Sequence, residues 1–100
     1  MKAIKYEGVL DKDCTCQNWL KHWMASQHKE ERPNCSVYNC TSEALVGGHV
    51  VLTDDIRKDV YITPMCLYHN TVRGKLLELC FDTVLESPCL LETCEPKPDY

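Results

Sequence analysis

The chain has 100 residues, which fits one domain with a single core and excludes a two-domain enzyme. Its hydrophobic fraction of 44% and charged fraction of 26% are those of a globular protein and exclude a disordered or fibrous one. The formal net charge of -4 argues against general nucleic-acid binding, because neutralising phosphates takes a surplus of Lys and Arg. All of this charge lies in residues 81–100, since ten basic and ten acidic residues balance over residues 1–80. The body of the domain therefore does not exclude nucleic acid.

Cysteine is the unusual component, with eight residues in the chain. An even number of cysteines in a short chain indicates either a disulfide framework or metal sites. Residues 1–8 hold no apolar run that would serve a secretory signal peptide, and no stretch approaches the roughly 18 apolar residues of a membrane span. We therefore expect a cytoplasmic protein with no membrane partner, in which thiols stay reduced unless a metal binds them. A disulfide-rich secreted domain is the alternative.

The first third of the chain predicts one helix. Residues 1–13 are weakly patterned, and Gly8 marks a turn. A helix is expected over residues 17–28, because four large apolar side chains fall on one helical stripe: Trp19, Leu20, Trp23 and Met24. A polar run that ends in Pro-Asn at residues 33–34 is the expected exit loop.

From residue 35 onward the pattern changes to short strands. Apolar and β-branched runs predict three of them, at residues 44–46, 49–52 and 60–63. Gly47 and Gly48 are expected to separate the first two strands, and a charged loop over residues 53–59 separates the second from the third. A β-hairpin with a charged loop is the simplest interpretation.

The remainder of the chain predicts a second helix and a last strand. Pro64 is expected to end the third strand, and the chain from Met65 to about Arg73 can turn helical before Gly74 closes it. The last strand is expected over residues 76–81. A Pro-rich acidic tail follows, so the prediction is one zinc-binding domain over residues 1–95 with a flexible acidic end at 96–100.

The strongest motif is a set of four metal-ligand side chains. A C-x4-C pair, a spacer that fits a hairpin and a C-x2-H pair make up the set: Cys35, Cys40, Cys66 and His69. Two close soft ligands, a spacer and a second close pair are the usual plan of a structural zinc site. Cys66 and His69 lie three residues apart, so one helical turn places both on the same face. We expect a structural Zn²⁺ here, and the alternative is a group of buried free thiols with an incidental histidine.

With Gly-Gly-His-Val at residues 47–50 and Asn70 directly after His69, this arrangement resembles the zinc-bearing branch of the HNH, or His-Me finger, nucleases. The resemblance covers residues 33–75. It implies an α+β fold with a small zinc-stabilised ββα core of the treble-clef type, here with an added N-terminal helix. It also implies a metal-dependent endonuclease with DNA as partner, His49 as general base and Asn70 as a second site residue. Family members bind a catalytic ion as well, which would be a second divalent ion, Mg²⁺ or Zn²⁺.

The chain departs from the family pattern at the catalytic ion. The residue before the base is usually an Asp, Glu or His that binds this ion, and here it is Gly48. A further His or Asn commonly follows on the helix, but residues 71–74 read Thr-Val-Arg-Gly. A carboxylate of the hairpin loop could substitute, from Asp54, Asp55 or Asp59. Otherwise the chain is a catalytically degenerate member, with His49 hydrogen-bonded in the hairpin or bound to a second metal.

A second cluster of reactive residues surrounds the first predicted helix. Cys14, Cys16 and His22 supply three metal ligands, one short of a closed zinc site, and His49 could complete it. Alternatively, the tryptophans form a packed core with His22 at the helix surface, or Cys16 is a reactive thiolate near the helix N-terminus. Three cysteines lie outside both clusters, with Cys80 expected in a strand core: Cys80, Cys89 and Cys94.

Two functions follow from these motifs. The first is a zinc-binding HNH-like protein that contacts nucleic acid, as an endonuclease with His49 as general base if it is active. The second is a non-catalytic zinc-finger module, an adaptor or inhibitor, that binds a protein partner through the helix at 17–28 or the acidic tail. Treble-clef scaffolds host both kinds of function, so the fold by itself does not decide between them.

Overall fold

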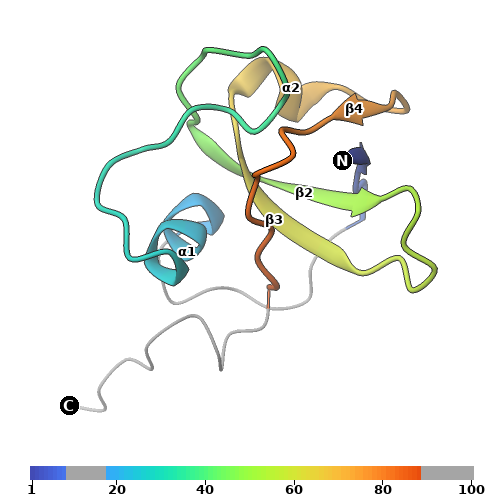
Figure 1. The fold of residues 1–100 in the computed structure, drawn as a ribbon, viewed down its shortest axis with the longest axis horizontal. Helices are drawn as coiled ribbons and strands as arrows, with labels where there is room; N and C mark the ends of the chain where they lie inside the picture. The colour runs from blue at the N-terminus through green and yellow to red at the C-terminus, as the bar shows by residue number, and fades with distance from the viewer. Residues whose placement is uncertain (9–17, 89–100) are drawn as a thin grey trace.

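A computed structural model describes residues 1–8 and 18–88 of the chain. Four strands form one antiparallel sheet in the order β3-β2-β1-β4, with two short helices beside it (Figure 1). The elements in chain order are β1 (Lys2–Lys5), α1 (Trp19–Ser26), β2 (Val46–Leu52), β3 (Val60–Met65), α2 (Leu67–Thr71) and β4 (Leu77–Glu78). The α+β prediction is thereby confirmed. The flexible end predicted at 96–100 lies outside the described residues.

Helix α1 confirms the first predicted helix over a shorter range, and residue 17 lies outside the described residues. The Asn18 side chain caps it by accepting the backbone N–H of Lys21 at 2.9 Å. Leu20 and Trp23 are buried on the face that contacts β2 and β3. The indole N–H of Trp23 donates to the Val84 carbonyl at 2.8 Å, so residues that follow the sheet also cover the helix. Two residues of the predicted apolar stripe, Leu20 and Trp23, are therefore core, while Trp19 and Met24 are partly buried.

The prediction that Gly47 and Gly48 separate two strands is wrong, because β2 runs through both. A Cβ at Gly47 would lie 2.5 Å from the backbone carbonyl carbon of Trp19, at the start of α1. A Cβ at Gly48 would lie 2.5 Å from the Met65 sulfur on β3. These glycines serve close approach of neighbouring elements rather than a turn.

The expectation that Pro64 ends the third strand is also wrong, since β3 continues to Met65. Pro64 pairs in register with Gly47, and β3 is the outermost strand of the sheet, where a missing N–H is tolerated. The Pro64 carbonyl accepts the backbone N–H of Ser36 at 2.9 Å. This bond ties the segment before β2 to the end of the hairpin, where the metal-ligand residues follow.

The weakly patterned N-terminus contains a strand that the sequence did not predict. β1 lies between β2 and β4, with Ala3 opposite Leu52 on one side and Leu77 on the other. Its side chains alternate between exposed and buried, and Lys5 falls on a buried position. A four-residue strand with lysines at both ends has no apolar alternation strong enough to be recognised.

The last predicted strand is shorter than expected. β4 spans only Leu77–Glu78, and Cys80 lies beyond it, half-buried, with its N–H donating to the Ser36 carbonyl at 2.8 Å. The predicted strand-core position of Cys80 is therefore wrong. The chain then follows the outer edge of β3, where Ile62 and Glu86 exchange backbone hydrogen bonds (Figure 1).

The core joins the sheet to the cysteine-bearing segments. Its buried members are Ala3, Cys35, Val37, Val50, Met65, Cys66, Leu77 and Leu79. Two of the four predicted metal ligands thus belong to the main hydrophobic cluster. Within residues 1–8 and 18–88, no helix has the length and apolar character that crossing a membrane requires.

Candidate metal centre and adjoining cavity

The structure brings the four predicted metal ligands together. One ligand atom from each of them lies within 4.8 Å of all the others: Cys35, Cys40, Cys66 and His69. The His69 Nδ1 atom is 3.3 Å from the Cys66 sulfur and 3.7 Å from the Cys35 sulfur, and the sulfurs of Cys40 and Cys66 are 4.0 Å apart. Tetrahedral zinc with bonds of about 2.3 Å to sulfur separates two sulfurs by about 3.8 Å. The four residues are therefore close enough to hold a metal ion.

Local structure explains why these atoms converge. The chain turns sharply between the first two cysteines, with Asn39 at a positive φ of 64° and the Cys40 N–H donating to the Val37 carbonyl at 3.0 Å. Cys66 is the N-cap of α2, and its sulfur accepts the N–H of His69 at 3.5 Å. One turn and one helix start thus present two ligands each, from different backbone directions.

Burial and backbone dipoles set the charge of these thiols. Cys35 is 4% exposed, and burial raises its thiol pKa to about 11. A thiolate at that position needs a nearby cation, which a bound metal ion would supply. The backbone N–H of Ser42 contributes most to lowering the pKa of Cys40. Three sulfurs and one imidazole form a soft donor set of the kind that suits zinc.

A separate cavity of about 340 Å³ adjoins this centre, and both residues that the resemblance implies for catalysis line it. His49 comes from β2 and Asn70 from α2. The other polar residues that matter here are Lys5, Glu7 and Arg73, with Trp19 on the remaining side. The sequence pointed to His49 and Asn70 but missed the two cations and the carboxylate.

The two catalytic candidates reach this cavity from opposite faces of β2. His49 lies on the α1 side, with its ring edge-on to Trp19 at 5.6 Å between centroids. Gly48 lies on the α2 side, where a Cβ would come within 3.3 Å of the Asn70 side-chain oxygen. The pairing of β1 with β2 ends at Lys5, which lies opposite Val50. Beyond it, the Tyr6 N–H donates to the His49 carbonyl at 2.8 Å. Groups from both faces therefore border one cavity at the edge of β2 beyond β1.

Lys5 is the buried charge of this cavity. Its residue is 6% exposed, and its ammonium donates to the Asn70 Oδ1 atom at 2.7 Å. Burial and, to a smaller extent, Arg73 lower the pKa of Lys5 to about 8. Burial and then the Lys5 charge lower the pKa of His49. His49 is consequently a neutral imidazole near pH 7, able to accept a proton.

The residues present do not fit the catalytic divalent ion that the resemblance implies. Gly48 offers no ligand atom, and the tight space above it leaves a larger side chain no room. None of the loop carboxylates of Asp54, Asp55 and Asp59 lines the cavity, and Asp55 instead accepts the N–H groups of its own loop. Within the described part of the chain, the Cys35 cluster is the one group of three or more potential metal ligands.

The second predicted cluster is only partly visible. Cys14 and Cys16 lie outside the described residues, as do Cys89 and Cys94. His22 is 0% exposed, so its expected place at the helix surface is wrong. Its Nε2 atom lies 2.8 Å from the Ser87 carbonyl oxygen, which holds the ring between α1 and the segment after β4.

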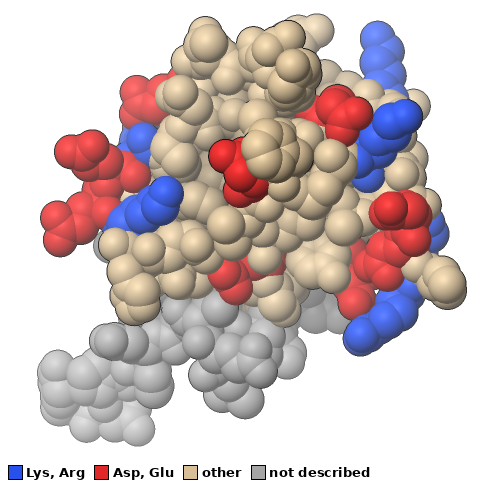
Figure 2. Space-filling model, in the orientation of Figure 1, with Lys and Arg blue, Asp and Glu red and all other residues tan. Residues whose placement is uncertain are grey.

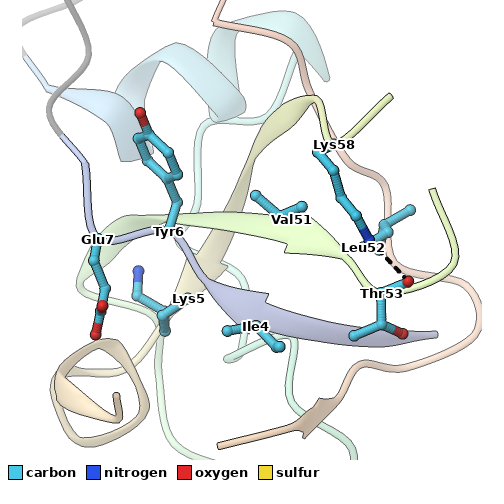
Figure 3. A pocket seen from close by; sticks show the side chains of 8 residues that line it. All are labelled: Ile4, Lys5, Tyr6, Glu7, Val51, Leu52, Thr53 and Lys58. Atoms are coloured by element: carbon cyan, nitrogen blue, oxygen red, sulfur yellow. Dashed lines mark hydrogen bonds between the residues drawn. The ribbon is translucent and has the colours of Figure 1, made fainter. Parts of the chain in front are cut away.

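A second hollow, of about 290 Å³, lies beside β1 and β2 (Figure 3). Apolar side chains of β1 and β2 form its floor, among them Ile4 and Val51. The Lys58 ammonium donates to the Thr53 carbonyl at 3.0 Å and covers one side. This hollow shares Lys5, Tyr6 and Glu7 with the first cavity but is not lined by His49, Asn70 or Arg73, so the cavity beside His49 is the candidate site.

Comparison of the chain with protein-family models, curated proteins and solved structures finds no match in any of the three.

Proposed function

We propose that this protein is an HNH-like zinc protein that contacts DNA through the cavity beside His49 and hydrolyses a phosphodiester there. The observation that carries the proposal is the meeting of His49, Asn70 and two cationic side chains around one cavity. A neutral imidazole beside cations suits a site where a phosphate is attacked by water.

The order of elements supports the finer description as a treble clef. A cysteine turn at residues 35–40 precedes the antiparallel hairpin of β2 and β3, and α2 follows directly with the second ligand pair. This is the knuckle, hairpin and helix sequence that the resemblance implies. The zinc identity is supported by three sulfurs and one nitrogen whose ligand atoms lie within 4.8 Å of one another. Four protein ligands close the site, so the ion would have a structural role.

His49 acts as general base in this proposal. It accepts a proton from water, the resulting hydroxide attacks phosphorus, and the bond between phosphorus and the leaving oxygen breaks. The leaving oxygen takes a proton from solvent, which yields a phosphate monoester end and a hydroxyl end. The lowered pKa of His49 keeps the imidazole ready to accept that proton near neutral pH.

Plasmid cleavage tests this role. The zinc-loaded protein is incubated with supercoiled DNA without added divalent ion and with Mg²⁺, Mn²⁺ or Ni²⁺, and nicking is measured on gels. His49→Ala should lower the rate at least about 100-fold, because a general base contributes on that order. His28→Ala is the matched control, since His28 is exposed and does not line the cavity. Equal cleavage by His49→Ala, or none by any form, would overturn the base assignment.

The protein-interaction module is the less supported function. Leu20, His22 and Trp23 of α1 are buried, so of the two tryptophans only the partly buried Trp19 remains accessible to a partner, at the cavity beside His49. A role for the acidic tail stays a prediction, because residues 89–100 lie outside the described part of the chain.

A further inference from the structure

The cavity beside His49 contains a cation where the resemblance would place a divalent ion. Gly48 cannot ligate a metal, yet the Asn70 oxygen that lies over it is bound to the Lys5 ammonium at 2.7 Å. The Lys5 ammonium thus lies beside the polar group of α2 that faces Gly48 of β2. The residue is 6% exposed, which is unusual for a lysine.

Burying this ammonium lowers the stability of the fold, and its contacts within the described residues offset little of that cost. Desolvation disfavours the charged form, and Asn70 Oδ1 is the one hydrogen-bond acceptor that contacts it within the described residues. No carboxylate forms an ion pair with Lys5 there, whereas Glu7 pairs with Arg73 at 3.8 Å. An ammonium offers three N–H groups, so Lys5 can donate to a ligand as well as to Asn70. Charges kept in such positions are typical of binding sites.

The charges around the cavity favour an anion. Lys5 and Arg73 contribute two positive charges, and Glu7 contributes one negative charge that already pairs with Arg73. The Arg73 side chain is 54% exposed and lies at the rim, while Lys5 is buried. A phosphate entering the cavity would meet the guanidinium first and the ammonium at depth, with the neutral His49 beside it.

We propose that the cavity is a metal-independent phosphodiester-binding site, in which the Lys5 ammonium and the Arg73 guanidinium bind the phosphate oxygens that a divalent ion binds in HNH nucleases. The inference rests on the proposed function, because it takes DNA as the ligand. The site lacks ligands for a divalent ion, and the Lys5 ammonium provides the positive charge in its place. Asn70 orients this ammonium through their hydrogen bond.

DNA binding in metal-depleted buffer tests the inference. The zinc-loaded protein is titrated against a short fluorescein-labelled DNA duplex, and anisotropy is measured at several salt concentrations, with and without added Mg²⁺. Lys5→Met removes the charge and keeps the chain length, and it should weaken binding about fivefold or more and reduce the salt slope by about one. Lys2→Met is the matched control, because Lys2 lies on the same strand but is exposed.

Two further variants keep the test valid if Lys5→Met folds poorly. Arg73→Met changes an exposed side chain and should also weaken binding. Glu7→Gln removes the one carboxylate among the described residues that line the cavity and should strengthen DNA binding, an outcome that damage to the fold does not produce. Circular dichroism and zinc content report whether each variant is folded.

The outcomes separate the inference from the proposed function. Binding without divalent ion that Lys5→Met or Arg73→Met weakens about fivefold or more, and that Lys2→Met leaves unchanged, supports the inference. Binding that requires Mg²⁺ overturns the inference and leaves a DNA-binding function in place. The same holds if the affinity is unchanged in Lys5→Met, Arg73→Met and Glu7→Gln. Absence of binding in every buffer overturns the proposed DNA contact and the inference with it.

Discussion

At the scale of single residues, Lys5 and His49 show how burial prepares a site. Both have a lowered pKa, chiefly because burial disfavours their charged forms, and each is further affected by a neighbouring cation. Their proposed roles differ because the ordinary pKa of a histidine is well below that of a lysine. His49 loses its charge near neutral pH and becomes a proton acceptor, whereas Lys5 keeps most of its charge and can bind an anion.

Lys5 should make DNA binding fall as pH rises above neutral. An ammonium is charged below its pKa, and the pKa of Lys5 is about 8, so the attraction for phosphate should decline between pH 7 and 9. Bound phosphate favours the charged form and shifts this decline upward. Anisotropy titrations of the wild type and Lys5→Met across this range measure the difference.

The other titratable groups of the cavity are common to both proteins in that comparison: Tyr6, Glu7, His49 and Arg73. The ratio of the two affinities therefore isolates Lys5. A ratio that stays constant from pH 7 to 9 would contradict the role of its ammonium.

At the scale of elements, the glycine pair of β2 determines how closely the helices approach the sheet. Gly47 faces the start of α1, and Gly48 faces Met65 and Asn70. A strand without these glycines would push α1 outward and move His49 away from Trp19. The pair that resembled a turn in the sequence is therefore what allows two helices to border one cavity.

Gly47→Ala should destabilise the fold by about 1–3 kcal/mol, which is typical of overpacking. The new Cβ would lie 2.5 and 2.6 Å from backbone atoms of Trp19 and Leu20, and backbone cannot move aside as a side chain can. Thermal or urea unfolding measures the loss. Gly48→Ala should cost less, because the flexible Met65 side chain is its main obstacle.

Gly74 offers a control for the glycine comparison. Nothing lies within 4 Å of a Cβ there, but its φ of 68° is unfavourable for alanine. Gly74→Ala should thus cost only about 1 kcal/mol, from backbone conformation alone. A Gly47→Ala protein as stable as the wild type would show that α1 does not pack against β2 this closely.

At the scale of the whole molecule, the metal centre connects the sheet to the segments on either side. Cys35 and Cys66 belong to the main hydrophobic cluster, so the fold and the site share the same residues. The face in Figure 2 carries acidic and basic side chains together along its edges and no broad basic surface. In the proposed function, DNA contact uses the local charges of the His49 cavity.

Removing the metal should unfold the domain. Small domains have total stabilities of about 5–15 kcal/mol, and structural zinc contributes a comparable amount. Chelation should shift tryptophan fluorescence to the red, because Trp23 is 5% exposed in the fold. Elemental analysis should find one zinc fewer per chain in Cys35→Ala than in the wild type.

Cys80→Ala is the matched control for the metal prediction, since Cys80 is half-buried but lies outside the ligand cluster. It should keep both the zinc content and the melting temperature. A chelated protein that melts within a few degrees of the untreated one would contradict a structural metal.

The sequence by itself determined the local parts of this protein. The spacing of Cys66 and His69 on one helical turn, the turn between Cys35 and Cys40, and the apolar stripe of α1 depend on neighbours a few residues away, which a sequence displays directly. These patterns identified both helices, the hairpin and the four residues that the fold brings close enough to hold a metal ion. The HNH resemblance added His49 and Asn70, whose catalytic roles stay predictions.

Only the tertiary structure decided which distant residues share a site. Lys5 and Asn70 are 65 positions apart, and their contact exists because β1 inserts between β2 and β4. The same packing made Gly47 and Gly48 part of a strand and turned His22 inward. Such contacts follow from long-range strand pairing and burial, which local periodicity does not encode, and so the cavity charges were visible only in the fold.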